Sequence, residues 1–133
     1  LNRDAGSCIE VATPPEFPKG IPGIWSPEHL FTASVSSCLM TTFLAIAENF
    51  KLVFSGFSCK SKGKLEQVDG KFLITEIILE PTVTIADEKD REKTERVLQK
   101  SEAACLISNS VKSKITMNPI IKISSIKSAV QVT

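Results

Sequence analysis

The distribution of charge predicts one long helix near the start of the chain. Residues 29–47 carry no formal charge apart from a proton that His29 could bind. Serine and threonine are spread through this run, and Glu28 and Glu48 bracket it, which is typical of a helix buried in a protein rather than of a membrane span. We therefore expect a long central helix, buried on nearly all sides.

The residues before this run indicate where the helix begins. Ser26 can cap the first turn, Pro27 suits the first helical position, where no N–H is needed, and Glu28 favours the positive end of the helix dipole. The helix is predicted to run from about Ser26 to about Phe50.

The next apolar positions alternate, which is typical of β-strands. Every second residue from Phe57 to Leu65 lies on one side of an extended run, and Asp69-Gly70 forms a turn of the hairpin type. The return strand, from Phe72 to about Ile85, is rich in Ile, Val and Thr. Pro81 marks a bulge or an edge position in this strand.

Charged residues then gather from Asp87 onward and are followed by a stripe of apolar and small residues, which predicts a second helix from about Asp87 into the Cys105 region. Short runs at Cys8–Ala12 and Met117–Ile123 are expected to be an early strand and a last strand. Strands before, between and after two helices indicate an α+β fold with an antiparallel sheet.

Length and composition restrict the function. The 133 residues, 14.5 kDa, suit a single domain, 1–133. A net charge of +1 provides no footprint for nucleic acid or an anionic membrane. Four cysteines without a C-x-x-C pair match neither a disulfide scaffold nor a zinc motif. Their number and spacing favour a protein of the reducing cytoplasm. The start lacks the apolar core of a signal peptide, and a chain beginning with Leu1 is compatible with residues missing upstream.

Several further residues have plain structural interpretations. His29 is the only histidine, which excludes a multi-histidine metal site, and we expect no metal and no cofactor. Cys8 and Cys59 alternate with strand residues and are expected to be structural. Trp25, the only tryptophan, could rim a pocket or anchor a core or an interface.

The other two cysteines stand in mostly uncharged, helix-like stretches, Cys38 in the first predicted helix and Cys105 near the end of the second. This placement suggests a buried redox pair. Burial statistics alone favour two packing residues instead, because cysteine is among the most buried residue types.

Two motifs resemble the osmotically inducible protein C and organic hydroperoxide resistance family. The first is Ser-Pro-Glu-His-Leu-Phe-Thr-Ala-Ser-Val-Ser-Ser-Cys, ending at Cys38; the second is Cys105-Leu-Ile-Ser-Asn109, in which Leu106 replaces the proline that often follows this cysteine. The resemblance covers nearly the whole chain. It implies a thiol peroxidase for organic hydroperoxides, an intertwined homodimer with both active sites at the subunit interface, and a small dithiol such as a lipoyl group as the reductant.

The resemblance also implies roles for single residues. Cys38 would be the peroxidatic thiolate that becomes a sulfenic acid, and Cys105 would resolve it as a disulfide. Glu28 matches a glutamate that works with an arginine to hold this thiolate ready. Arg3 is the only arginine before Cys38, so either Arg3 fills this role or the arginine lies upstream of Leu1.

Helix geometry constrains these roles. Ten residues on one straight helix separate Glu28 from Cys38 by about 15 Å along the axis. We therefore expect either that Glu28 reaches Cys38 of a partner chain or that the helix is broken between them. Cys38 lies far from the positive end of its helix, so a cation from elsewhere is expected to lower its pKa. Phe31, Leu39 and Phe43 would form an apolar rim suited to a bulky organic peroxide.

Two other functions remain compatible with the same residues. The chain could keep the fold and the dimer while binding a small hydrophobic ligand without turnover. It could also act as a redox sensor or thiol-exchange protein that uses the same pair of cysteines.

Overall fold

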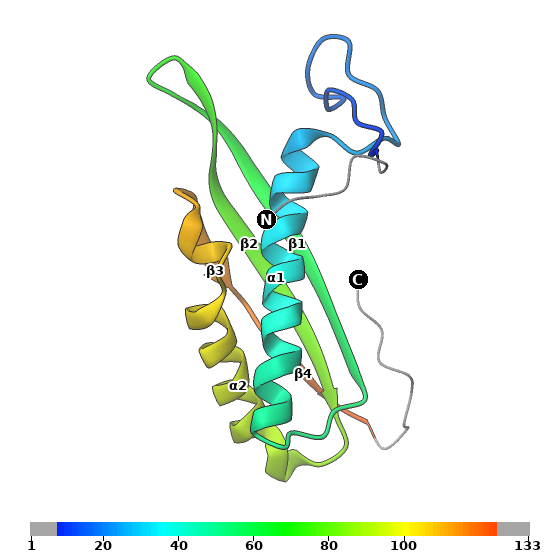
Figure 1. Ribbon diagram of the computed structural model, residues 1–133, viewed down its shortest axis with the longest axis vertical. Helices are drawn as coiled ribbons and strands as arrows, with labels where there is room; N and C mark the ends of the chain where they lie inside the picture. Colours follow the sequence, from blue (N-terminus) through cyan, green and yellow to red (C-terminus); the bar gives the residue numbers. More distant parts are fainter. Residues whose placement is uncertain (1–7, 125–133) are drawn as a thin grey trace.

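A computed structural model of the protein describes residues 8–124. Its helices are α1 (Pro27–Asn49) and α2 (Arg91–Ala104), with short 3-10 turns η1 (Glu88–Asp90) and η2 (Ser108–Ser110) flanking α2. Its strands are β1 (Gly56–Val68), β2 (Lys71–Ile85), β3 (Lys114–Met117) and β4 (Ile120–Ile123). The hairpin of β1 and β2 runs behind α1, and α2 lies beside α1 (Figure 1).

The predicted start and end of the first helix are confirmed. Ser26 Oγ accepts a hydrogen bond from the backbone N–H of His29 at 3.0 Å, and His29 Nδ1 accepts one from the backbone N–H of Ser26 at 3.2 Å. Histidine thus takes the place that glutamate or glutamine usually holds in a capping box. At the other end, Phe50 caps the helix.

The prediction that this helix is buried on nearly all sides is wrong for the single chain. Only one stripe of α1 is fully buried, while Ser37, Thr41, Leu44 and Ala45 are exposed. The reason is that the hairpin and α2 cover one side of the helix and leave the other side open. By length and composition alone α1 could cross a membrane, but its buried stripe packs within this fold.

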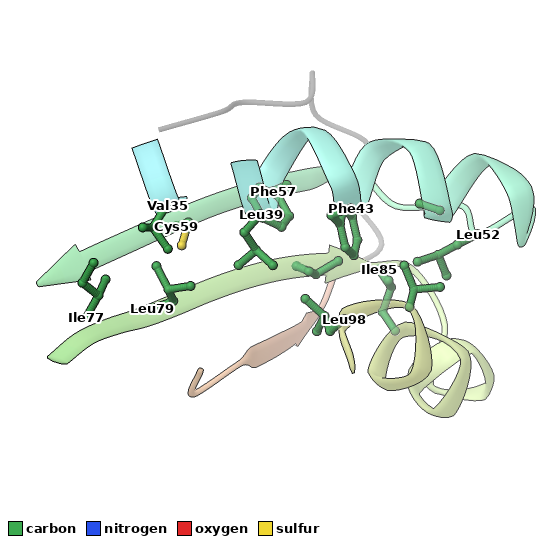
Figure 2. Close-up of a cluster of buried hydrophobic side chains, with 13 residues drawn as sticks. Val35, Leu39, Phe43, Leu52, Phe57, Cys59, Ile77, Leu79, Ile85 and Leu98 are labelled. Carbon is green, nitrogen blue, oxygen red and sulfur yellow. The ribbon is translucent and has the colours of Figure 1, made fainter. Parts of the chain in front are cut away.

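The core lies between α1, the hairpin and α2, as Figure 2 shows. The helix contributes Val35, Leu39 and Phe43, and the Phe43 ring packs 4.8 Å from the ring of Phe57 in β1. Leu98 closes the core from α2. This packing fixes the end of α2 against the middle of α1.

The hairpin is confirmed. β1 and β2 pair antiparallel, and Asp69 and Gly70 have φ values of 51° and 77°. Two successive positive φ angles are what a tight hairpin turn requires, and this explains the Asp-Gly sequence. The bulge lies at Lys64/Leu65 and not at Pro81.

The prediction of an antiparallel sheet is wrong beyond the hairpin. β3 and β4 both pair with β2 in parallel. The cause is the connection through α2, which carries the chain back so that the next strands run in the same direction as β2. The sheet is therefore mixed.

The predicted last strand is divided into two. β3 ends opposite Leu79 and β4 begins opposite Thr82, with Asn118 and Pro119 between them. Pro81 of β2 lies at this gap, and it has no N–H to donate to a neighbouring strand. Pro81 therefore marks a local edge, which was one of its two predicted positions.

The predicted early strand at Cys8–Ala12 is wrong. This segment is irregular, although the Ala12 N–H donates to the Trp25 carbonyl at 2.9 Å. Four prolines follow between residues 14 and 22, and the chain turns back through Phe17 and Gly20 instead of joining the sheet. Proline fixes φ and removes a donor, so a regular ladder is disfavoured here.

Candidate active site

The fold brings the two predicted redox cysteines together. Cys38 lies in the middle of α1 and is partly exposed, and Cys105 is the buried C-cap of α2. Both are free thiols, and they lie close enough for each to shift the pKa of the other. They come together because α2 ends beside the middle of α1.

Four hydrogen-bond donors surround the Cys38 sulfur. Burial acts to raise the pKa of Cys38, but hydrogen bonds from the Ile107 N–H, the Cys105 thiol, the Thr42 hydroxyl and the Leu106 N–H outweigh burial and hold this pKa below its ordinary value. The Thr42 oxygen lies 4.0 Å from the sulfur. Such donors favour the thiolate form of a cysteine.

The positive end of α1 is too far away to activate Cys38, as expected from the sequence. In residues 8–124 the N–H groups that follow the end of α2 lower the pKa of Cys38, and no cation is among the groups that do so. The expected cation stays a prediction, because Arg3 lies outside the described residues. Sequence reasoning missed the N–H groups because every residue except proline carries an N–H, and only the turn after Cys105 aims two of them at one sulfur atom.

The surroundings of Cys105 have the opposite effect. Burial raises the pKa of Cys105, the hydroxyl and the N–H of Ser108 lower it, and the hydrogen bond and charge of Cys38 raise it, so the net pKa is above the ordinary value. The pair is thus polarised: when one of the two thiols loses a proton, the negative charge is favoured on Cys38 and the proton on Cys105.

Glu28 and Cys38 do not meet within one chain. α1 is continuous from Pro27 to Asn49, so the alternative of a broken helix is excluded, and about 15 Å of helix axis separates the two residues. The Oε2 atom of Glu28 is buried and has no hydrogen-bond partner among the described residues. Arg3, the predicted partner of Glu28, lies outside the described residues.

A cavity of about 810 Å³ lies between α1, β1 and the loop that precedes α1. Trp25 is half exposed at its rim and packs edge-on against His29, so the pocket-rim interpretation of Trp25 is confirmed. Glu28 lines this cavity and also a second one of about 520 Å³, which Phe17, Phe31 and Phe72 border. Cys38 lines neither cavity.

The remaining cysteines differ from the pair. Burial above all raises the pKa of Cys59 in β1 to about 11, and the charge of Glu80 adds to this effect while the Glu80 N–H opposes it. This agrees with the structural role predicted for Cys59. Cys8 is exposed and lies outside any strand. Across residues 8–124, no three His, Cys, Asp or Glu side chains gather in a way that could hold a metal ion.

Known structures share this arrangement of helices and strands. An OsmC-like protein of unknown function from Vibrio cholerae has a TM-score of 0.77 and 27% identity, covering 88% of this chain and 80% of that one. An organic hydroperoxide resistance protein OsmC from Legionella pneumophila has a TM-score of 0.69 and 22% identity, covering 86% and 81%. An organic hydroperoxide resistance protein from Elizabethkingia anophelis, with thiocyanate bound, has a TM-score of 0.71 and 20% identity, covering 87% and 81%.

Sequence comparison leads to the same group of proteins. No curated protein matches the chain. The family described as OsmC-like protein matches residues 20–119, which include Glu28, Cys38 and Cys105. This match extends over most of the sequence and agrees with the shared fold. The chain therefore belongs to the OsmC-like protein family.

Proposed function

We propose that this protein is a thiol peroxidase that reduces organic hydroperoxides through Cys38 and Cys105. The observation that carries the proposal is the polarised pair: one partly exposed thiol whose anion is stabilised by two N–H groups, next to a buried thiol that keeps its proton. Low thiol pKa, exposure and a neighbouring second cysteine are what a peroxide-reactive cysteine needs. The names of two structural neighbours, organic hydroperoxide resistance proteins, support the same reaction.

The reaction follows from this polarity. The Cys38 thiolate attacks one oxygen of the hydroperoxide, an S–O bond forms, the O–O bond breaks, and the alkoxide leaves and takes up a proton to become an alcohol. Cys38 is then a sulfenic acid. The sulfur of Cys105 attacks Cys38, an S–S bond forms, the S–O bond breaks, and water leaves with the proton from Cys105. An external dithiol reduces the disulfide and is itself oxidised to a disulfide.

A second copy of the chain would complete the site. α1 is unbroken, so Glu28 can approach a Cys38 only on a partner chain, and its buried, unpartnered Oε2 is available for a hydrogen-bond donor at an interface. The open side of α1 carries no charged residue between residues 29 and 47, which suits contact with another copy. We propose a homodimer in which Glu28, with Arg3 as its candidate partner, acts on the Cys38 of the other subunit.

Mixing two inactive variants tests whether Glu28 acts across the interface. If Glu28 serves the partner, a hybrid dimer of one Glu28→Gln chain and one Cys38→Ser chain contains one intact site of two. Unfolding the two variants and refolding them together should then give hybrid dimers with up to about half of the activity of a wild-type dimer. If Glu28 serves its own chain, no site is intact and no activity returns. Each variant refolded alone is the control.

The exposure of the two thiols bears on the reductant and the compartment. Cys105 is buried, so only a small reductant that first attacks the partly exposed Cys38 sulfur can open the disulfide. We propose a small dithiol of the lipoyl type, and a cytoplasmic location because the thiols are free. Turnover with dihydrolipoamide should exceed turnover with an equal concentration of a monothiol.

Stopped-flow reaction of the reduced protein tests the central proposal. Cumene or tert-butyl hydroperoxide is expected to consume two thiols per chain, faster than hydrogen peroxide does, as the names of the two organic hydroperoxide resistance neighbours suggest. Cys38→Ser should abolish this loss, and Cys59→Ser, the matched control, should preserve it. Slow loss that is the same for all peroxides would overturn the peroxidase proposal.

One observation favours a second candidate function. The cavity of about 810 Å³ does not include Cys38, and its size suits a small molecule. A protein that binds a small hydrophobic ligand there without turnover would show saturable binding of an apolar fluorescent probe. It would also show unselective thiol loss in the stopped-flow experiment.

A further inference from the structure

The turn after α2 holds two serines with different surroundings. Ser110 is exposed, and its hydroxyl donates to the Leu106 carbonyl at 2.8 Å. Asn109 ties the same turn to α2, because its side-chain amide donates to the Ala103 carbonyl at 3.0 Å and its N–H donates to the Cys105 carbonyl at 3.1 Å. The turn is thus fixed to the helix end, and Ser110 has a structural task in it.

Ser108 has no comparable structural task. Its hydroxyl oxygen is buried and makes no hydrogen bond of regular geometry to any described residue. A buried hydroxyl without a partner is unfavourable and calls for an explanation. The nearby polar group is the sulfur of Cys105, towards which both the hydroxyl and the N–H of Ser108 act as donors that favour the thiolate.

The effect of Ser108 on the Cys105 sulfur becomes larger, relative to the opposing effect of Cys38, after the first step of the proposed reaction. In the reduced pair, burial raises the pKa of Cys105 most, and the hydrogen bond and charge of Cys38 raise it further. Once Cys38 becomes a sulfenic acid, its thiolate charge is used up in the S–O bond, and the repulsion from that charge is removed. The Ser108 hydroxyl and N–H remain in place, so the balance at Cys105 moves towards the thiolate when the thiolate is needed as a nucleophile.

We propose that Ser108 is a positioning residue that activates Cys105 for the second, disulfide-forming step. It turns its hydroxyl proton to the Cys105 sulfur as negative charge develops there. The Cys105 thiolate then attacks the Cys38 sulfur, the S–S bond forms, the S–O bond breaks, and the leaving hydroxide combines with the proton released by Cys105. This inference rests on the peroxidase proposed above and assigns to Ser108 one step of its reaction.

Single-turnover kinetics of Ser108→Ala test this role. With tert-butyl hydroperoxide, the rate of sulfenic acid formation at Cys38 should stay within about twofold of the wild type, while disulfide formation should slow about tenfold, as expected for the loss of a hydrogen bond to an anion. Sulfenic acid trapped by dimedone and counted by mass spectrometry should therefore accumulate. Ser108→Thr, which keeps the hydroxyl, should restore the rate, and Ser110→Ala is the matched control.

A direct titration makes the inference testable even without peroxidase activity. In a chain that carries Cys8→Ser and Cys38→Ser, the ultraviolet absorbance of thiolate reports Cys105 at lower pH and Cys59 near a pKa of about 11. Adding Ser108→Ala should raise the pKa of Cys105, and adding Ser110→Ala should not. An unchanged titration, or equal slowing of both kinetic steps, would overturn the role of Ser108. Failure of the wild type to form any sulfenic acid would instead overturn the proposed function.

Discussion

Cys38 in α1 and Cys59 in β1 lie in two different regions of the molecule. Cys38 lies where α1 meets the end of α2, and its sulfur faces the N–H groups of Leu106 and Ile107. Cys59 lies in β1, where its own strand and the neighbouring β2 use their backbone groups to pair with each other. Burial therefore dominates at Cys59, and hydrogen bonds outweigh it at Cys38.

The difference shows that the local backbone, and not burial alone, decides whether a thiol is activated. A strand commits its N–H groups to the sheet, whereas the turn after a helix end has N–H groups to spare. The cavity of about 810 Å³ lies on the inert side, lined by Cys59 and by the face of α1 opposite Cys38. Within one chain, this cavity and the activated thiol are separate features.

Alkylation rates should show the largest contrast between the two regions. At pH 7, iodoacetamide is expected to label Cys38 more than about 100-fold faster than Cys59. A pKa of about 11 instead of 9.0 lowers the thiolate fraction of Cys59 about a hundredfold, and the pKa of Cys38 is shifted the other way. Mass spectrometry of labelled peptides measures both rates, and unfolded protein, in which the rates should converge, is the control. Equal rates in the folded protein would remove the contrast.

The difference in alkaline unfolding between the wild type and Cys59→Ala should report Cys59. The folded state keeps a proton on Cys59 up to about pH 11, whereas an unfolded thiol releases it near pH 9.0. The stabilisation is therefore complete below pH 9.0 and is lost as the pH rises to about 11, by about 2–3 kcal/mol over two pH units. Urea unfolding of wild type and Cys59→Ala checks this, because the stability gap between them should shrink by that amount. A gap independent of pH contradicts the raised pKa.

The sequence predicted well those features that depend on neighbouring residues. The start of α1 follows from Ser26 and Pro27, and the hairpin turn follows from Asp69-Gly70. The parallel pairing of β3 and β4 and the absence of a strand at Cys8–Ala12 depend on contacts between distant segments, so local patterns could not predict them.

In the candidate site, too, some features could be predicted from the sequence and others depend on the fold. The family resemblance identified Cys38 and Cys105, and the structure brings them together. The N–H donors that polarise the pair depend on the turn after α2 and were invisible in the sequence. Ser108 could have been noticed as a part of the Cys105-Leu-Ile-Ser-Asn motif, but nothing in the sequence showed that its hydroxyl is buried.

Removal of single hydrogen-bond donors around Cys38 should slow its alkylation by smaller factors than the difference between Cys38 and Cys59. Cys105→Ala is expected to slow alkylation of Cys38 up to about tenfold at a pH below the ordinary thiol pKa, because the thiolate loses a hydrogen bond and its pKa rises. Thr42→Val, which keeps the size of the side chain, should have a smaller effect, since the Thr42 oxygen is 4.0 Å from the sulfur. Labelling that is unchanged in both variants would mean that the backbone N–H groups alone lower the pKa.

A close contact on the cavity side provides the smallest and most local test. A Cβ atom at Gly63 of β1 would lie 2.6 Å from Thr32 Oγ1, which donates to the Glu28 carbonyl at 3.0 Å, whereas a Cβ atom at Gly56 would meet Thr84 Oγ1 at an ordinary 3.6 Å. Gly63→Ala should therefore lower the free energy of unfolding by about 1 kcal/mol relative to Gly56→Ala, the value of one hydrogen bond.

The double variant decides whether that loss arises from the Thr32 contact. In a Thr32→Ala background there is no hydroxyl to displace, so Gly63→Ala should cost little, and urea unfolding of the four proteins measures the coupling. Alkylation of Cys38 should be the same in all four, because Thr32 and Gly63 line the cavity and do not contact the Cys38 sulfur. A change in Cys38 labelling would show that the two sides of α1 are coupled, and the activated thiol could then respond to what occupies the cavity.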